Sequence, residues 1–311
     1  MEERTEQHAL AAHAAQFAPP SSPPDLLTIG HITRDVHEDG SFSLGGTVSF
    51  ASLTASRLGA SVAIVTRADA QLVLELPRRL PGIGLAVAPS DQTTTFDNRY
   101  HEGFRTQYLL ARGDSLFAEN VPPAWRAAPI VLLAPLAQEI GPDILALFPR
   151  HPGALIAATP QGWLRRWDAD GRVWPTPWKD AEQVLPRLDA LILSHDDLLP
   201  FANGNRAEAD AILTRWSHFV PLLVATDGRH GATLFQQGRT EHFPAYSASE
   251  LDPTGAGDVF AAAFLVHLSR HANPRAAIDF ANAVASLSIE HEGISGVPTL
   301  EQVQERQARG W

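Results

Sequence analysis

The segment Leu251-Asp-Pro-Thr-Gly-Ala-Gly-Asp258 places three small residues before a carboxylate, and the apolar run VFAAAFLVHL follows at once. Gly255, Ala256 and Gly257 leave backbone N–H groups uncovered, so an anion can approach them closely. The helix predicted to start there adds unpaired N–H donors and a partial positive charge, which favours a phosphate. Asp258 would repel a resting phosphate, but it is suited to take a proton from an alcohol attacking that phosphate.

A structural alternative is that Asp258 only caps the following helix, because Asp is favoured at the N-cap. Short glycine motifs often occur without function. Seven specific residues leading directly into a helix of small residues favour the phosphate-site interpretation.

The motif DPTGAGD, followed by Phe260 and several alanines, resembles the C-terminal signature of the PfkB (ribokinase-like) carbohydrate kinases. The N-terminal half agrees, because LTIG followed by HITRD and the later LGG resemble the first strand and the di-glycine segment of that family. The resemblance extends from about Asp25 to Val303. It implies ATP-dependent phosphorylation of a hydroxyl on a small polyol, with ATP and Mg²⁺ as cofactors and K⁺ as a further cation.

Composition limits the other classes of function. The chain has 311 residues, of which 44% are hydrophobic, and it has no long apolar tract, so we expect a soluble globular protein without a membrane span. The net charge of −11 argues against nucleic acid as a partner. The absence of cysteine excludes disulfides and thiolate metal sites, and it fits a cytoplasmic location.

Short apolar runs alternate with helical stretches, which indicates βαβ units and a buried parallel sheet. The runs lie at residues 26–30, 61–68, 129–135, 154–159, 190–194 and 221–228. With the resemblance, this pattern predicts an α/β protein: a ribokinase-like three-layer α/β/α core with a mainly parallel sheet, plus a small β-sheet lid.

We expect one kinase domain over residues 25–305. An N-terminal tail and proline-rich linker over 1–24 would precede it, and a short tail over 306–311 would follow. Mixed polar and β-forming residues at about 35–48 and 93–112 predict the lid strands, the second segment as a hairpin turning at Glu102-Gly103. The resemblance also implies a homodimer formed through the lid.

The resemblance implies the residues that hold the acceptor. Asp35 matches a substrate-binding Asp, whose two oxygens can accept hydrogen bonds from polyol hydroxyls; the alternative is a solvated loop acid. Gly45 and Gly46 would let a sugar lie against the backbone, although they also suit a plain turn. Phe50 stands where ribokinase-type chains commonly have Asn, so it would offer an apolar wall. The run GGTVSF resembles the inositol kinase branch, as do Gln161 and Arg165.

The same resemblance implies a donor side. Where the family usually has Asn-x-x-Glu near Mg²⁺, this chain has Ser194-His-Asp-Asp197, so Asp197 or Asp196 would act on the metal indirectly. Ser194 is equally suited to cap a helix. Asp252 falls where relatives hold a monovalent cation. The remaining nucleotide contacts would be Thr226, Gly228, Gly231, Asn282 and Thr254; Asn282 could instead be an ordinary helix-surface amide.

Two alternatives stay open. A non-catalytic ribokinase-like protein that binds a ligand or regulates a partner would fit the altered Asn-x-x-Glu element, and a nucleoside kinase of the same family would fit the remaining motifs. A dinucleotide-dependent oxidoreductase is disfavoured, because no Gly-x-Gly-x-x-Gly follows the first strand.

Overall fold

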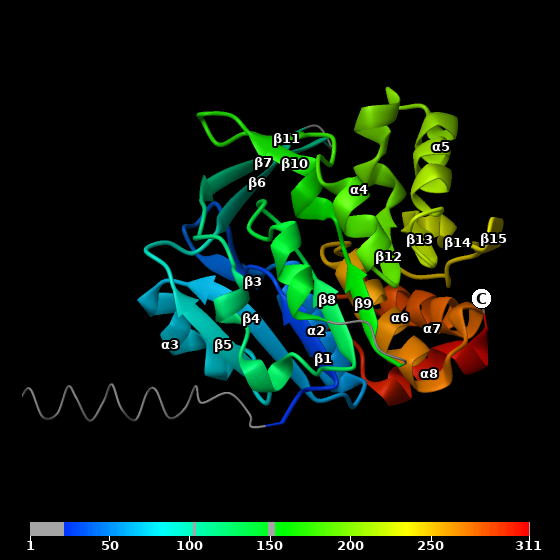
Figure 1. Cartoon of the computed structure of the whole chain (residues 1–311), viewed down its shortest axis with the longest axis horizontal. Helices are drawn as coiled ribbons and strands as arrows, with labels where there is room; N and C mark the ends of the chain where they lie inside the picture. The colour runs from blue at the N-terminus through cyan, green and yellow to red at the C-terminus, as the bar shows by residue number, and fades with distance from the viewer. Residues whose placement is uncertain (1–21, 102–103, 149–152, 311) are drawn as a thin grey trace, which may run out of the picture.

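A nine-stranded sheet forms the centre of the computed structural model, which describes residues 22–101, 104–148 and 153–310 (Figure 1). The strand order is β15-β14-β13-β12-β9-β8-β1-β4-β5, parallel from β5 to β13, with β14 and β15 added antiparallel at one edge. The strands are β1 (Leu26–Ile29), β4 (Val62–Ala68), β5 (Gly84–Pro89), β8 (Ile130–Leu133), β9 (Leu155–Ala158), β12 (Ala190–Ser194), β13 (Leu222–Thr226), β14 (Ala232–Gln236) and β15 (Arg239–Phe243).

Helices and turns cover both faces of this sheet, so its central strands are buried on both sides. One face packs on α2 (Thr47–Arg57), α3 (Ala70–Arg79), α6 (Ala256–His271), α7 (Pro274–Ser288) and α8 (Leu300–Arg309). The other face packs on α4 (Ala181–Val184), α5 (Arg206–Trp216) and several 3₁₀ turns. All four residues of β1 and of β8 are buried, as expected for parallel strands between two layers.

The predicted α/β class with a mainly parallel sheet is confirmed. All six apolar runs are strands of the large sheet, namely β1, β4, β8, β9, β12 and β13. Strands β5, β14 and β15 were not predicted. Strands β14 and β15 mix polar and apolar residues, and β5 begins with Gly and ends with Pro; all three lie at or next to a sheet edge and are only partly buried.

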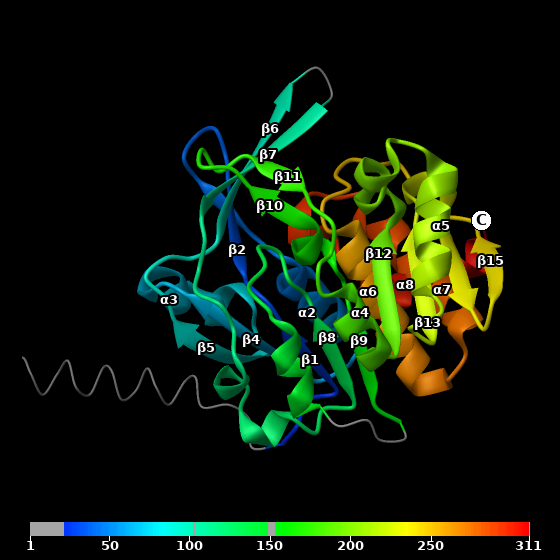
Figure 2. The ribbon, with the colours of Figure 1, turned by 45° about the horizontal axis from the view of Figure 1, so that its top comes forward.

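A second, four-stranded sheet, here called the small sheet, projects beyond the core (Figure 2). Its order is β3-β2-β6-β7, and it comprises β2 (Thr33–Val36), β3 (Phe42–Gly45), β6 (Thr95–His101) and β7 (Phe104–Ala111). The short hairpin of β10 (Arg165–Trp167) and β11 (Val173–Pro175) adjoins β7, since Leu109 donates a hydrogen bond to Gly171. The predicted turn at 102–103 lies outside the described residues.

Two of the predicted segment boundaries differ from the structure, and a third lies mostly outside the described residues. The segment 35–48 predicted as lid strands ends in a helix, because α2 begins at Thr47. The predicted tail at 306–311 is wrong up to Arg309, because α8 continues to that residue and Arg306 forms an ion pair with Glu290 at 2.8 Å. Most of the predicted N-terminal tail and linker, residues 1–21, lies outside the described residues.

Glu139 is a fully buried carboxylate that ties two strand ends together. Its oxygens accept hydrogen bonds from the backbone amides of His31, Leu136 and Ala137 at 2.7–3.0 Å. His31 follows β1 and Leu136 follows β8, so the side chain fixes the loops leaving two neighbouring strands. A buried acceptor with three donors is costly to remove, because each donor would be left unsatisfied.

Replacing Glu139 with Ala should lower the free energy of unfolding by about 1–3 kcal/mol for each amide left unsatisfied. Glu139→Gln should cost less, because its amide oxygen still accepts. The control is Glu305→Ala on the exposed face of α8, which should change stability by less than about 0.5 kcal/mol. Urea denaturation followed by far-UV circular dichroism measures all three. Equal stability of Glu139→Ala and Glu305→Ala would contradict the anchoring role.

Candidate active site

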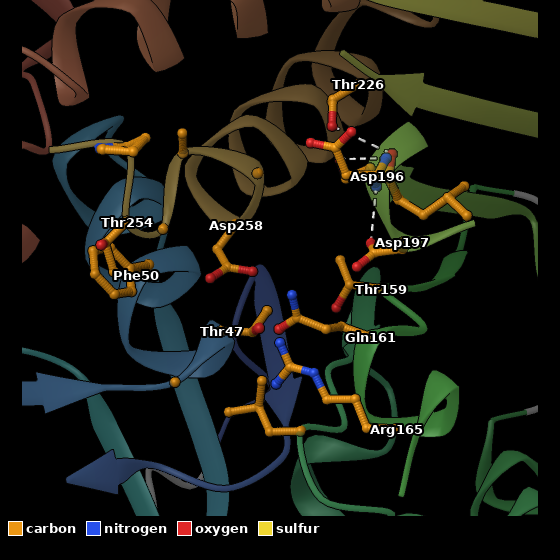
Figure 3. Close-up of a pocket in the computed structure, with 18 of the residues that line it drawn as sticks. Thr47, Phe50, Thr159, Gln161, Arg165, Asp196, Asp197, Thr226, Thr254 and Asp258 are labelled. Carbon is orange, nitrogen blue, oxygen red and sulfur yellow. Dashed lines mark hydrogen bonds between the residues drawn. The ribbon is translucent and has the colours of Figure 1, made fainter. Parts of the chain in front are cut away.

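A cavity of about 550 Å³ lies at the carboxyl ends of the parallel strands, between the core and the small sheet (Figure 3). Ligand crevices in open α/β sheets are expected at this edge. Ser194 ends β12, Thr226 ends β13 and Thr159 follows β9, and all three line the cavity. The first turns of α2 and α6 close the opposite wall. We call this space the acceptor cavity.

Helix α6 meets the acceptor cavity with an uncapped N-terminus. Its N-cap is Gly255, in the left-handed conformation with φ of 78°, and no side chain caps the turn. The amides of Gly257 and Asp258 lie in the first turn, where no carbonyl of the helix precedes them. Among the other α-helices of the described residues, α3, α5, α7 and α8 are capped by the side chains of Asp69, Asn205, Asn273 and Thr299, whereas α2 and α4 also lack a side-chain cap.

Asp258 stands in the first turn of α6 and lines the acceptor cavity. The alternative that it is the N-cap is excluded, because that position belongs to Gly255. Burial raises the pKa of Asp258 to about 6, and the charges of Asp197 and Asp35 raise it as well. The Thr47 hydroxyl and the Arg165 guanidinium, which both face the cavity centre, act in the opposite direction and lower the pKa (Figure 3).

The two acids at the end of β12 lie differently. Asp197 accepts a hydrogen bond from the Ser194 amide at 3.1 Å, so its carboxylate closes a capping turn. Burial raises the pKa of Asp197, which Arg165 and Gln161 counteract. Asp196 is exposed and lines both the acceptor cavity and a neighbouring cavity. Ser194 does form the predicted cap, since its Oγ accepts from the Asp196 amide at 3.2 Å.

The glycines of the predicted acceptor segment are required by the protein itself. A Cβ on Gly45 would come 2.2 Å from Oδ2 of Asp35, which lies on the adjacent strand β2. A Cβ on Gly46, whose φ is 93°, would come 2.5 Å from the His31 carbonyl oxygen. Asp35 and Gly46 both line the acceptor cavity. The Gly-Gly pair therefore lets β2, β3 and the start of α2 approach one another closely.

Phe50 lines the acceptor cavity only with an edge, because just 4% of the residue is exposed. Its ring carbons lie 2.4–2.7 Å from where a Cβ on Gly255 would be. The ring thus packs directly beneath the turn that begins α6. This contact adds a supporting role to the apolar wall predicted for Phe50.

Several acceptor-side residues were predicted and others were missed. Gln161 and Arg165 line the cavity from the side of β9 and β10, as the sequence predicts. Thr47, Asn98 and Gln107 also line it and were not predicted. Asn98 and Gln107 face each other on β6 and β7, where the Gln107 amide donates to Asn98 at 2.9 Å. Both strands carry runs of consecutive polar residues rather than a strict alternation, so no simple pattern in the sequence marks these two side chains.

A second cavity of about 550 Å³, here called the donor cavity, adjoins the first and shares Asp196, Thr226, Ala256 and Gly257 with it. The predicted nucleotide contacts Gly228, Gly231 and Asn282 line the donor cavity as well. Thr254 is not among them; it lines the acceptor cavity instead.

Two of these donor-side residues also serve the fold. A Cβ on Gly231 would come 2.1 Å from the Phe243 carbonyl oxygen, so this glycine permits close approach of β15. Asn282 is buried, which excludes the helix-surface alternative. Its amide donates to the Pro244 carbonyl at 3.0 Å and holds the chain that leaves β15.

Asp252 joins two loops below the acceptor cavity. Its carboxylate accepts from the amides of Thr254 and Gly293, both at 2.9 Å. Burial raises the pKa of Asp252, but these hydrogen bonds outweigh burial and hold the pKa below its ordinary value. Within the described ranges, no cluster of three or more His, Asp or Glu side chains could hold a metal. No helix there is long and apolar enough to cross a membrane.

Comparisons with known proteins agree with this geometry. Residues 168–300 match the profile of the pfkB family carbohydrate kinases. Fructokinase-2 of Zea mays is 28% identical over 168 residues, which cover 50% of this chain and 50% of that protein, so the match spans about half of each.

Two solved structures share the fold. One is a pyrophosphate-dependent kinase in the ribokinase family, complexed with a pyrophosphate analog and myo-inositol; it is 23% identical, covers 90% of this chain and 99% of its own, and has a TM-score of 0.76. The other is Arabidopsis thaliana ribokinase complexed with ribose and ATP, with 20% identity, coverage of 91% and 98%, and a TM-score of 0.68.

The charge arrangement predicts how Asp258 titrates. Its carboxyl carbon signal in a ¹³C NMR titration should have a midpoint near pH 6, against an ordinary value near 4. Arg165→Met should raise that midpoint, because it removes a positive charge that favours the carboxylate. Arg166→Met is the matched control, since Arg166 pairs with Asp168 on the exposed face of the same strand. A midpoint insensitive to Arg165→Met would show that the guanidinium does not act on Asp258.

Proposed function

From the premise that the chain carries a pfkB family carbohydrate kinase domain over residues 168–300, we propose that it transfers the γ-phosphoryl group of ATP to a hydroxyl of a small polyol. Asp258 acts as the general base, and the backbone of residues 255–257 forms the anion hole. The polyol occupies the acceptor cavity and the nucleotide occupies the donor cavity.

The position of Asp258 carries this proposal. It stands beside an uncapped helix N-terminus, in a turn whose residues Ala256 and Gly257 line both cavities. A phosphoryl group passing between the cavities would meet the amides of this turn, which stabilise developing charge without reorganising. A pKa near 6 leaves the carboxylate largely ionised at neutral pH, yet basic enough to take a proton.

The acceptor cavity supports a polyhydroxylated substrate. Asp35, Asn98, Gln107, Gln161 and Arg165 surround it with carboxylate, amide and guanidinium groups, which can pair with several hydroxyls at once. The mostly buried Phe50 adds one apolar edge. We propose a cyclic polyol such as an inositol ahead of ribose, because a C–H face suits that edge. A nucleoside as acceptor is the alternative to be compared directly.

The donor cavity supports a nucleotide as donor. Its volume of about 550 Å³ extends beyond the phosphate-binding turn to Tyr246, Asn282 and Ala285. A base and ribose need such a space, whereas pyrophosphate alone does not. Comparing ATP with pyrophosphate as donors, each with the same acceptor, tests this choice.

The proposed cations fit the residues present. Mg²⁺ bound mainly by phosphates and water needs few protein ligands, and the exposed Asp196 at the border of the two cavities suits an indirect contact better than the backbone-bound Asp197. When bound, Mg²⁺ supplies charge stabilisation to the transferring phosphoryl group. A monovalent cation at Asp252 stays a proposal, tested by activity in K⁺ against Tris buffers.

The small sheet has a proposed role in both substrate covering and assembly. We propose that the small sheet covers the acceptor as a lid and that two copies associate through it, which sedimentation equilibrium would test.

ATP binding without turnover on any sugar, nucleoside or inositol would favour a regulatory ribokinase-like protein. The position of Asp258 in the first turn of α6, at a helix N-terminus without a side-chain cap, favours catalysis.

Asp258→Asn should lower kcat by about 10²–10⁴-fold, the usual loss when a general base is removed. ATP affinity, measured by isothermal titration calorimetry, should persist, because the amides of the turn are unchanged. Asp91→Asn, an exposed acid in the loop before β6, is the control and should behave as the native protein. A variant that keeps most of its kcat would exclude Asp258 as the base.

Asp35→Ala should raise the acceptor KM much more than the ATP KM, because Asp35 lines only the acceptor side. Loss of hydrogen bonds to a charged group costs about 1.5–3 kcal/mol, or roughly 10–150-fold in affinity. Asp39→Ala in the exposed turn between β2 and β3 is the matched control. Steady-state kinetics with each substrate varied in turn gives both constants, and parallel changes in the two would place Asp35 outside the acceptor site.

A further inference from the structure

We propose that His31, a buried residue that lines neither the acceptor cavity nor the donor cavity, is a positioning residue for acceptor binding. The chain passes between the core and the small sheet four times in its described part: after β1, after β3, after β5 and after β7. His31 contacts all four passages. The proposal rests on the proposed function, because it assigns the acceptor to the cavity beneath the small sheet.

The imidazole joins the two later passages. Its Nδ1 lies 2.6 Å from Oγ1 of Thr94, which precedes β6, and its Nε2 lies 2.9 Å from the carbonyl oxygen of Asp114, which follows β7. The Asp114 carbonyl can only accept, so Nε2 carries the hydrogen and Nδ1 accepts from the Thr94 hydroxyl. Oγ1 of Thr94 in turn accepts from the Gly113 amide at 2.9 Å. Every polar atom of this group is thus paired.

The backbone of His31 joins the other two passages. His31 itself forms the passage after β1, and its carbonyl oxygen lies against Gly46 at the passage after β3, where a Cβ would come within 2.5 Å of it. The His31 amide donates to the buried Glu139 at 3.0 Å, which fastens the junction to the core. The imidazole and the backbone of His31 therefore join all four passages at one point.

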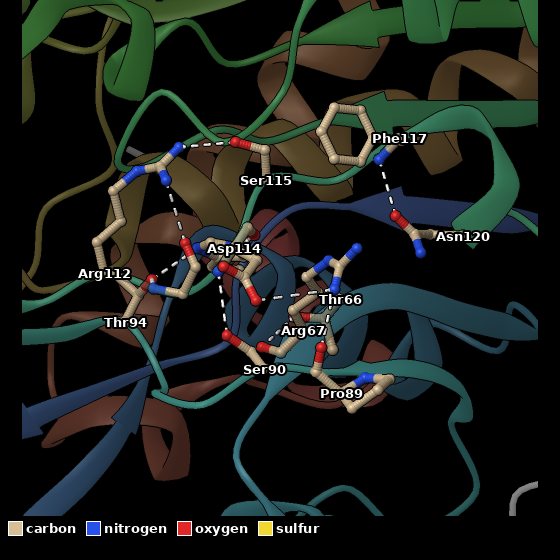
Figure 4. Close-up of polar contacts among 12 residues, drawn as sticks. Thr66, Arg67, Pro89, Ser90, Thr94, Arg112, Asp114, Ser115, Phe117 and Asn120 are labelled. Atoms are coloured by element: carbon tan, nitrogen blue, oxygen red, sulfur yellow. Dashed lines mark hydrogen bonds and ion pairs between the residues drawn. The ribbon is translucent and has the colours of Figure 1, made fainter.

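The surroundings keep His31 neutral. Its burial lowers the pKa, and the charges of Arg112 and Arg67 lower it further, while Glu139 and the hydrogen bond to Asp114 raise it. Figure 4 shows Arg67, Arg112 and Asp114 around the passage after β7, where the Asp114 amide donates to Oγ of Ser90 at 3.1 Å. This outer layer ties the two later passages together. It also reaches the core directly, because Arg112 donates to the carbonyl oxygens of Ala137 and Gln138 and Thr93 donates to Asp69. His31 is therefore one of several ties, and the one that joins all four passages.

The junction separates the part of the site that the small sheet carries from the part that the core carries. The small sheet carries Asp35, Phe96, Asn98 and Gln107 into the acceptor cavity, and none of its residues lines the donor cavity. Loosening the junction should therefore weaken acceptor binding and leave nucleotide binding intact. A residue that only stabilised the fold would affect both.

The test compares His31→Leu, His31→Gln and Thr94→Val with a matched core control, Thr28→Val. Thr28 is buried in β1 and its hydroxyl bonds Ser52 at 3.0 Å, so its loss also removes one buried hydrogen bond. His31→Leu should raise the acceptor KM roughly tenfold, the equivalent of one lost buried hydrogen bond, with the Kd for ATP unchanged. Thr94→Val should act in the same direction. His31→Gln should recover part of the loss, because its amide can still donate to the Asp114 carbonyl.

Hydrogen–deuterium exchange supplies a readout independent of catalysis. Amides of β6 and β7 should exchange faster in His31→Leu than in the native protein, while those of β12 and β13 stay as slow as before. Equal losses of acceptor and ATP binding, unchanged exchange in β6 and β7, or the same pattern in Thr28→Val would each overturn the proposal. If the native protein phosphorylates no polyol, the proposed function fails, and exchange alone decides whether His31 holds the small sheet.

Discussion

The packing of helix α2 against helix α6 is the contact on which the site depends. The Phe50 ring fills the space that a side chain on Gly255 would need, and Thr47, one turn earlier on the same face of α2, faces Asp258 (Figure 3). Helix α2 continues directly from the small sheet, whereas α6 continues from the Gly255 turn. One interhelical contact therefore sets the distance between the small-sheet side of the cavity and Asp258, the proposed base. Gly255 is doubly constrained, by its φ of 78° and by this ring.

Charge is the second constraint. Four aspartates, at 35, 196, 197 and 258, line a cavity to which Arg165 brings the one basic side chain among its lining residues. Such an excess of negative charge opposes a triphosphate, and it is one reason why the pKa of Asp258 rises. The dipole of α6 offsets part of it, and a divalent cation would offset more. Under the proposed function, the same excess that raises the pKa of Asp258 would therefore make binding of a triphosphate depend on a divalent cation.

Sequence reasoning succeeded where the signal is local. The apolar runs form the parallel strands because their residues are apolar enough to be buried between two layers. The turn in DPTGAGD is likewise local, because Gly255 can adopt the left-handed conformation that it requires. It failed where contacts join distant segments. Thr254 was assigned to the nucleotide but faces the acceptor cavity, and nothing near Thr47 in the sequence indicates that its hydroxyl meets Asp258. The anchoring of His31 by Glu139 spans 108 residues, so no spacing could reveal it.

The two cavities draw differently on the two halves of the chain, and this bears on what similarity can say about the substrate. Every residue that lines the donor cavity lies between Ser194 and Ile289, inside the segment 168–300 that matches the family profile. The acceptor cavity draws Asp35, Asn98, Gln107 and Arg165 from outside that segment. The segment that matches the family thus contains the whole lining of the donor cavity and the α6 turn to which the proposed phosphoryl transfer is assigned. Under the proposed function, the choice of acceptor depends largely on side chains outside that segment, so it must be inferred from their own geometry rather than from relatives.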